Sequence, residues 1–89
     1  MASGLLAVIG PITTAARLEK KLGQTTGMTI RIVHTPEEIA GGGGCSYSLR
    51  TKAENMPVVM EIAAKYKIRV KAYYITEIND GKEVYHAIS

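Results

Sequence analysis

The single cysteine of the chain, Cys45, directly follows four consecutive glycines, Gly41–Gly44. A thiol becomes a nucleophile when it ionises, and neighbouring positive charge favours the thiolate. Two basic side chains could supply that charge, His34 eleven residues earlier and Arg50 five residues later. Successive glycine N–H groups can also hold an anion. This pattern predicts a reactive thiol that the glycine segment presents; the alternative is a buried, inert cysteine.

The candidate site has Cys45 as its reactive group. Its candidate binding residues are Gly41, Gly42, Gly43, Gly44, Ser46, Arg50 and His34. A phosphate-binding loop is not indicated, because no Gly-Lys-Ser/Thr and no long helix follow the glycines. A zinc site or metal chaperone would need paired cysteines, whereas this chain has one Cys and two distant histidines, His34 and His86. We therefore expect no metal and no cofactor, and ordinary strand roles for both histidines.

Length and composition bound what must position this site. Eighty-nine residues with 46% hydrophobic residues predict one folded domain over residues 1–89. One cysteine cannot form an intrachain disulfide, and the start of the chain has neither a basic leader nor an apolar run long enough for a membrane span. We therefore expect a cytoplasmic protein. The net charge of +3 permits an acidic protein or a nucleic acid as partner but demands neither.

Two segments have the apolar spacing of an amphipathic helix. The first, Ile12–Gly23, follows Pro11, which suits the start of a helix, and it ends at a glycine, a common stop signal. The second, Asn55–Lys67, tolerates Pro57 because that residue falls in the first turn. The predicted core-facing residues of the two helices are Ala15, Leu18, Leu22, Val59, Ile62, Ala63 and Tyr66.

A single helical turn is predicted at Pro36–Ala40. Thr35 can cap it, and Glu38 stands three residues later, as in a capping box. Glu37 and Glu38 are thereby explained as carboxylates that stabilise the positive end of a helix dipole. The glycine segment therefore lies between a helical turn and the strand that follows.

Five segments have the pattern of β-strands, either alternating or wholly apolar. In the third, Cys45, Tyr47 and Leu49 share one face, and Ser46, Ser48 and Arg50 share the other. The dipeptide Asp80-Gly81 predicts a tight hairpin before the last strand. The five predicted strands are Leu5–Ile9, Thr29–His34, Cys45–Arg50, Lys67–Ile78 and Glu83–Ile88.

This order predicts the α+β class, as a ferredoxin-like β-α-β-β-α-β sandwich with an additional C-terminal β-strand or hairpin. Two helices would pack on one face of a mixed sheet. The other face would be partly open, or covered by a second subunit in a homodimer.

A basic stripe with tyrosine is the one feature that favours RNA. Lys67, Arg69, Lys71 and Tyr73 alternate in the fourth predicted strand, and RNA-recognition sheets stack bases on such faces. The aromatic residues that those sheets carry on their other strands are missing here, apart from Tyr47. A solvated face is the simpler interpretation, and we do not expect nucleic acid as the main partner.

The segment "HTPEEIAGGGGCSYSLR", preceded by "LLAVIGPITTAARLEKKL", resembles the selenium/sulfur carrier-like proteins, a family of small bacterial domains. The resemblance covers Leu5 to Val70 and is most specific over Thr35–Arg50. The positions that match the family pattern are Thr35, Pro36, Glu38, Cys45, Leu49 and Arg50. The chain departs from it in the glycine run, in Ser46 where the family has glycine, in the start of the first helix, and in the added hairpin after Tyr74.

The resemblance implies a carrier, more a non-enzymatic protein than an enzyme, with a persulfide or selenopersulfide on Cys45. Its partners would be a donor similar to a cysteine desulfurase and an acceptor enzyme. A lone thiol suits this role, because a second cysteine would attack the persulfide and release sulfide. The alternative is a dimeric ligand-sensing or regulatory module that binds a small molecule at the glycine-rich loop, with the cysteine incidental.

Overall fold

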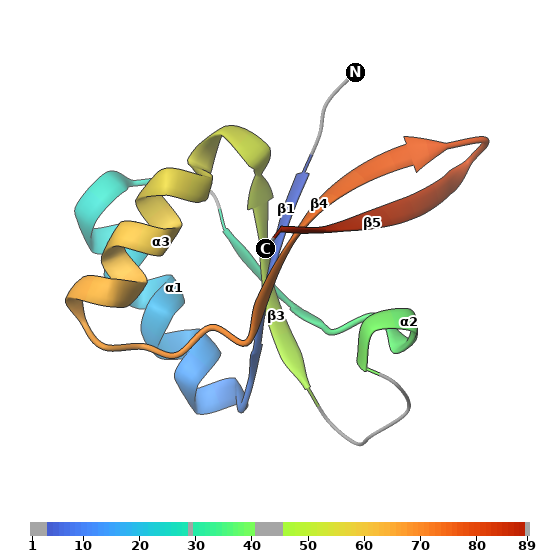
Figure 1. The fold of residues 1–89 in the computed structure, drawn as a ribbon. Coiled ribbons are helices and arrows are strands. Elements are labelled where there is room, and N and C mark those ends of the chain that lie inside the picture. Colours follow the sequence, from blue (N-terminus) through green and yellow to red (C-terminus); the bar gives the residue numbers. More distant parts are fainter. Residues whose placement is uncertain (1–3, 29, 41–45, 89) are drawn as a thin grey trace.

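The computed structural model describes residues 4–28, 30–40 and 46–88, and its five strands form one sheet in the order β2-β3-β1-β4-β5 (Figure 1). The strands are β1 (Gly4–Gly10), β2 (Arg31–His34), β3 (Tyr47–Lys52), β4 (Ala72–Asn79) and β5 (Lys82–Ile88). Every neighbouring pair is antiparallel. The prediction of a mixed sheet is therefore wrong. Strands β1 and β2, which the first helix connects, do not pair with each other, because β3 lies between them.

The helical elements are α1 (Ile12–Thr26), α2 (Glu37–Ala40), the 3-10 turn η1 (Ala53–Asn55) and α3 (Met56–Lys65). The α+β class and the additional C-terminal strand are confirmed. The order is not a clean β-α-β-β-α-β, because α2 interrupts the connection from β2 to β3. In Figure 1, α1 and α3 lie on one side of the sheet and α2 lies on the opposite side.

The hydrophobic core lies between the sheet and the α1–α3 layer. Alternate residues of β1 point into it, and Leu49 of β3 joins them from the neighbouring strand. The predicted stripes of both helices are confirmed, except that Tyr66 is only partly buried. The buried core residues are Leu5, Ala7, Ile9, Ala15, Leu18, Leu22, Leu49, Val59, Ile62, Ala63 and Ile68.

Two predicted boundaries are wrong by three residues or more. Helix α1 continues past Gly23 and ends at Gly27, whose φ of 67° is left-handed and whose N–H bonds the carbonyl of Gly23. The strand predicted from Lys67 begins only at Ala72. Lys67 has a left-handed φ of 55°, so the chain turns out of α3 there and crosses back to the sheet over residues 67–71.

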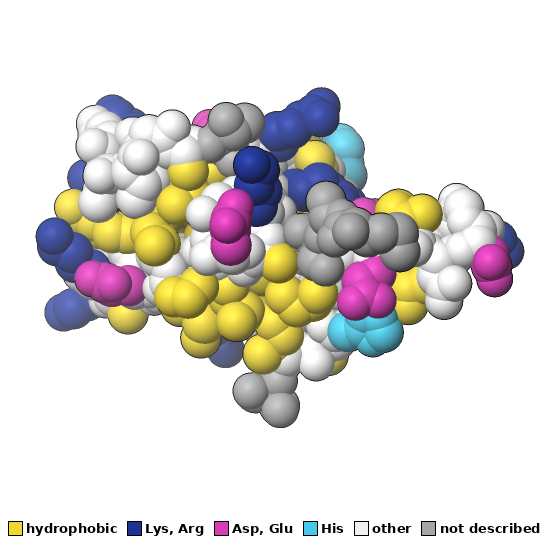
Figure 2. Space-filling view, turned by 90° about the horizontal axis from the view of Figure 1, so that it is seen from above, with side chains coloured by type: hydrophobic (Ala, Val, Ile, Leu, Met, Phe, Trp, Pro, Cys, Tyr) yellow, Lys and Arg dark blue, Asp and Glu magenta, His cyan; other side chains and the backbone are white. Residues whose placement is uncertain are grey.

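The β4–β5 hairpin forms at the predicted dipeptide. Asp80 and Gly81 have φ of 53° and 77°, the left-handed pair that a two-residue hairpin turn of type I′ needs. The pairing runs from Tyr73 opposite Ile88 to Asn79 opposite Lys82. The hairpin extends beyond the helix layer in the ribbon (Figure 1) and projects from the body of the molecule in the space-filling view (Figure 2). No helix of the described residues therefore packs against its outer half.

The sheet face opposite α1 and α3 is covered in part by the chain itself. Leu6, Val8, Ser48 and Thr76 point to this face and are each less than 10% exposed. Helix α2 lies on this side of the sheet (Figure 1). None of the helices in the described ranges is long and apolar enough to cross a membrane.

Candidate functional site

The site predicted from sequence falls partly inside the described residues. Cys45 and Gly41–Gly44 lie outside them. Ser46, His34 and Arg50 lie inside, on the strands β2 and β3 or directly beside them. The structure therefore describes the residues around the predicted site: the end of β2, the start of β3 and the sheet face next to them.

Hydrogen bonds close the base of the β2–β3 connection. The backbone N–H of Thr35 donates to the carbonyl of Ser46 at 2.8 Å. The Thr35 hydroxyl lies 2.9 Å from the Ser46 hydroxyl and 2.6 Å from that of Ser48. Thr35 is 8% exposed and Ser48 is fully buried. Ser46, which directly follows Cys45, is thus held to the end of β2 by both backbone and side chain.

This hydroxyl cluster changes the role expected for Thr35. The sequence predicted that Thr35 caps α2, but in the structure its hydroxyl bonds the two serines of the neighbouring strand. The turn of α2 is closed instead by the carbonyl of Pro36, which accepts from the N–H groups of Ile39 and Ala40 at 2.9 Å. The Thr-Pro pair therefore fixes the start of the connection to the sheet.

His34 ends β2 beside this base. It pairs with Tyr47 across the β2–β3 ladder, and the two rings lie 4.8 Å apart at an angle of 34°. The imidazole is exposed. His34 therefore directly precedes Thr35, and its ring lies tilted against that of Tyr47, which directly follows Ser46.

Arg50 lies on the sheet face opposite α1 and α3, where Glu83 of the hairpin binds it. Its Nη1 and Nη2 donate to the two carboxylate oxygens of Glu83 at 2.6 and 2.9 Å, and the Tyr85 hydroxyl donates to Glu83 at 2.8 Å. The Arg50 and Glu83 side chains are 31% and 26% exposed. This bidentate ion pair connects β5 to β3, although β1 and β4 lie between these two strands in the sheet.

The pair shifts the titration of its members. Hydrogen bonding to Arg50 lowers the pKa of Glu83, and the same contact raises the pKa of Arg50. Burial, together with the bond to Glu83, raises the pKa of the Tyr85 phenol. The Arg50 guanidinium is therefore charged and already bound to a carboxylate. A role for it in holding another anion would require that anion to share the guanidinium with Glu83.

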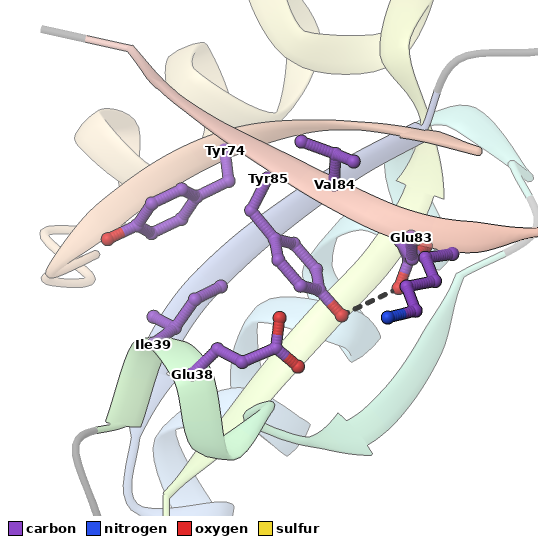
Figure 3. A pocket seen from close by; sticks show the side chains of 7 residues that line it. Glu38, Ile39, Tyr74, Glu83, Val84 and Tyr85 are labelled. Atoms are coloured by element: carbon purple, nitrogen blue, oxygen red, sulfur yellow. Dashed lines mark hydrogen bonds between the residues drawn. The ribbon is translucent and has the colours of Figure 1, made fainter. Parts of the chain in front are cut away.

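A hollow of about 470 Å³ separates α2 from the hairpin. Figure 3 shows Ile39 and Glu38 of α2 on one side of it, with Tyr74 and Tyr85 of β4 and β5 opposite them. The charge of Glu38 contributes to the raised pKa of Tyr85. Both acids of this hollow thus lie near one phenol, and only Glu83 has a cationic partner among the described residues.

Metal binding has no support in the described part of the chain, where no group of three His, Cys, Asp or Glu side chains could hold an ion. His34 and His86 lie on β2 and β5, the two edge strands of the sheet, and the Nε2 of His86 is 3.6 Å from the carboxylate of Glu77. The structure therefore does not bring the two histidines together as ligands.

Comparison with protein families gives a match along most of the chain. The family model described as "Putative Se/S carrier protein-like" matches residues 5–75. The chain belongs to this Se/S carrier-like family. The match runs from β1 into β4, so it includes the β2–β3 connection and leaves out most of the hairpin. Searches of curated proteins and of solved structures found no match.

Sequence reasoning missed two residues that surround Arg50 in the structure. Glu83 and Tyr85 lie in the hairpin beyond the family match, yet Glu83 binds Arg50. The alternation of the last strand places both on one face, which was visible in the sequence. Their contact with a strand 33 residues away was not, since it depends on how the hairpin curves over the sheet.

Proposed function

We propose that this chain is a carrier that holds sulfur or selenium on Cys45 and delivers it to an acceptor enzyme in the cytoplasm. The observation that carries the proposal is the family match over residues 5–75. The closed base of the connection supports it. Ser46 is tied to Thr35, so the segment that ends in Cys45 returns to the sheet at a fixed point.

The loading step needs no oxidant, because the sulfur transferred is already at the oxidation level of a persulfide. The Cys45 thiolate attacks the outer sulfur of a donor persulfide. A new S–S bond forms on Cys45, the donor S–S bond breaks, and the donor cysteine leaves as a thiolate. Delivery repeats the exchange with the acceptor as the attacking group. A selenopersulfide would be formed and passed on in the same way.

Mass spectrometry tests this directly. The protein is incubated with a cysteine desulfurase and cysteine, alkylated without reductant, and digested. We expect one added sulfur atom on the peptide that contains Cys45, which reductant removes, and none in Cys45→Ser. A parallel reaction with selenocysteine and a selenocysteine lyase distinguishes the two elements. Unmodified Cys45 with several desulfurases and with the lyase would contradict the proposal.

The hollow beside α2 supports one other candidate function, a module that senses a small molecule. Its walls combine Ile39, Val84 and two tyrosine rings with a few polar groups, the mixture usual for ligand pockets. The two functions separate through one variant. Cys45→Ser should abolish sulfur transfer in a carrier but leave ligand binding unchanged in a sensor, as measured by isothermal titration with the candidate metabolite.

A further inference from the structure

We propose that one flank of α1, together with the end of α3 and the α3–β4 connection, is a docking surface for an acidic protein. Six side chains form it, and we call them the basic band: Arg17, Lys21, Lys65, Lys67, Arg69 and Lys71. All are exposed except Lys21, which is half-buried. The proposal rests on the carrier function only in taking the acidic partner to be the enzyme that loads Cys45.

Contacts around Tyr66 hold the middle of the band together. Arg17 Nη2 donates to the carbonyl of Tyr66 at 3.1 Å. The Nζ atoms of Lys21 and Lys65 lie 4.7 and 5.6 Å from the centre of its ring. Cations from both helices thus contact one aromatic residue. Like charges repel each other, so these contacts with Tyr66 are what hold the cations side by side.

The other end of the band lies at the start of α1. Arg69 and Lys71 line a shallow hollow of about 350 Å³ with Pro11 and Thr14. Gly10, with a φ of 113°, makes room there. A Cβ on Gly10 would stand 3.1 Å from the Lys71 ammonium nitrogen. Tyr47, the first residue of β3, pairs with Gly10. The band therefore begins at the end of the sheet where the chain returns from Cys45.

The charge of the chain is concentrated in this band. The whole chain has 11 basic and 8 acidic residues. The five basic residues outside the band are outnumbered by the eight acidic ones, so the rest of the chain carries −3 and the band +6. In the described residues the only ion pairs are Arg50–Glu83 and His86–Glu77, so no band residue has a carboxylate partner. Glu61, one turn before Lys65 on α3, also forms none.

The geometry favours carboxylates of a protein over nucleic acid. Single-stranded nucleic acids need free aromatic faces on which bases stack. The Tyr66 ring already has two ammonium groups over it. Tyr73, the aromatic residue of the predicted RNA-binding stripe, packs against the core instead, where burial raises the pKa of its phenol. The stripe itself does not exist, since Lys67, Arg69 and Lys71 precede β4.

Binding to defined probes tests the surface. The probes are a labelled peptide of consecutive glutamates and a single-stranded RNA of equal charge. The band variant is Arg69→Glu with Lys71→Glu. The matched control is Arg31→Glu with Lys52→Glu, which changes the net charge equally at exposed sites outside the band. We expect peptide affinity at low salt to fall about tenfold in the band variant and less than about twofold in the control.

Two results would overturn the inference. Equal losses in both variants would mean that the peptide responds to the net charge of the protein and does not bind at the basic band. Tighter binding of the RNA than of the peptide, lost in the band variant, would make the surface one for nucleic acid. Circular dichroism checks that both variants are folded. We expect the band variant to fold, because acidic side chains beside the start of α1 interact favourably with the positive end of its helix dipole.

A second measurement separates this inference from the carrier function. Cys45 is loaded either by a cysteine desulfurase with cysteine or by inorganic polysulfide, which needs no docking. We expect the band variant to slow the enzyme reaction about tenfold and to leave the polysulfide reaction unchanged. Unchanged enzyme rates in the band variant would contradict docking by the band. If desulfurases load neither chain, the carrier proposal fails, and the peptide titration still decides the band.

Discussion

The two faces of the sheet are held by different interactions. The face toward α1 and α3 is an apolar core of buried Leu, Ile, Val and Ala side chains. The opposite face buries Leu6 and Val8 but is fastened by polar contacts, the Thr35–Ser46–Ser48 hydroxyls and the Arg50–Glu83 pair. Apolar packing needs only volume and periodicity, whereas hydrogen bonds need specific partners at specific distances.

The division also has a functional side. Of the residues predicted for the site around Cys45, Ser46 and Arg50 make their contacts on the polar face, where individual hydrogen bonds position the chain. The basic band lies on the outside of the helix layer, which the apolar core holds rigid. We therefore expect variants of the core to reduce stability most, and variants of the polar face to give smaller losses that act on the hairpin and on the β2–β3 connection.

The largest effect is expected from the apolar core. Leu18→Ala removes a fully buried side chain of α1 and leaves a cavity, so the free energy of unfolding should fall by about 2–5 kcal/mol. Urea denaturation measures it. Met60→Gln, on the exposed side of α3 at 44% exposure, is the control and should change stability by less than about 0.5 kcal/mol. Similar losses in both variants would show that the core is not packed as described.

The next effect concerns the pair that joins the hairpin to β3. Glu83→Gln leaves the Arg50 guanidinium without its carboxylate. Since the two side chains are 31% and 26% exposed, water replaces part of the contact. We expect a loss of about 1–2 kcal/mol. A double-mutant cycle with Arg50→Gln isolates the coupling. A coupling energy near zero would mean that the curvature of the hairpin holds β5 in place and that the ion pair does not contribute.

The pH dependence of stability tests the Arg50–Glu83 contact separately from packing. The folded-state pKa of Glu83 lies below its ordinary 4.5, because Arg50 hydrogen-bonds the carboxylate. Its contribution is therefore complete above pH 4.5 and is lost as the pH falls through the lower folded-state value. The stability difference between wild type and Glu83→Gln should shrink as the pH falls from about 6 to below 4. A difference that stays constant with pH would assign the effect to packing.

The smallest of these effects is expected at the base of the β2–β3 connection. Ser48→Ala removes one hydroxyl partner of Thr35, which keeps Ser46, so we expect a loss of about 1 kcal/mol. Hydrogen exchange at the amide of Thr35, which bonds Ser46 at 2.8 Å, should become faster. Thr51→Ala, on the same strand but the opposite face, is the matched control. If that amide exchanges equally in both variants, the hydroxyl cluster does not hold the connection.

Periodicity carried the prediction of the helix-covered face. The spacing of Ala15, Leu18 and Leu22 identified the buried side of α1, and alternation in β3 correctly put Leu49 and Ser48 on opposite faces. Local signals failed at two places. A glycine can end a helix or lie inside one, and the helix continues through Gly23. The alternation after Lys67 favoured a strand, whereas Lys67 itself has a left-handed φ that turns the chain.

Local patterns in the sequence were enough to identify the α+β class, the Asp80-Gly81 hairpin, the lone thiol beside the glycine run and the family pattern over Thr35–Arg50. These depend on neighbouring residues, on regular spacing or on composition. The folded chain was needed to show that Thr35 bonds two serines and that Glu83 binds Arg50. It was also needed to show that the six cations of the basic band, from α1, the end of α3 and the α3–β4 connection, lie together. Those contacts join residues far apart in the chain, and their partners are set by strand order and twist, which no local pattern encodes.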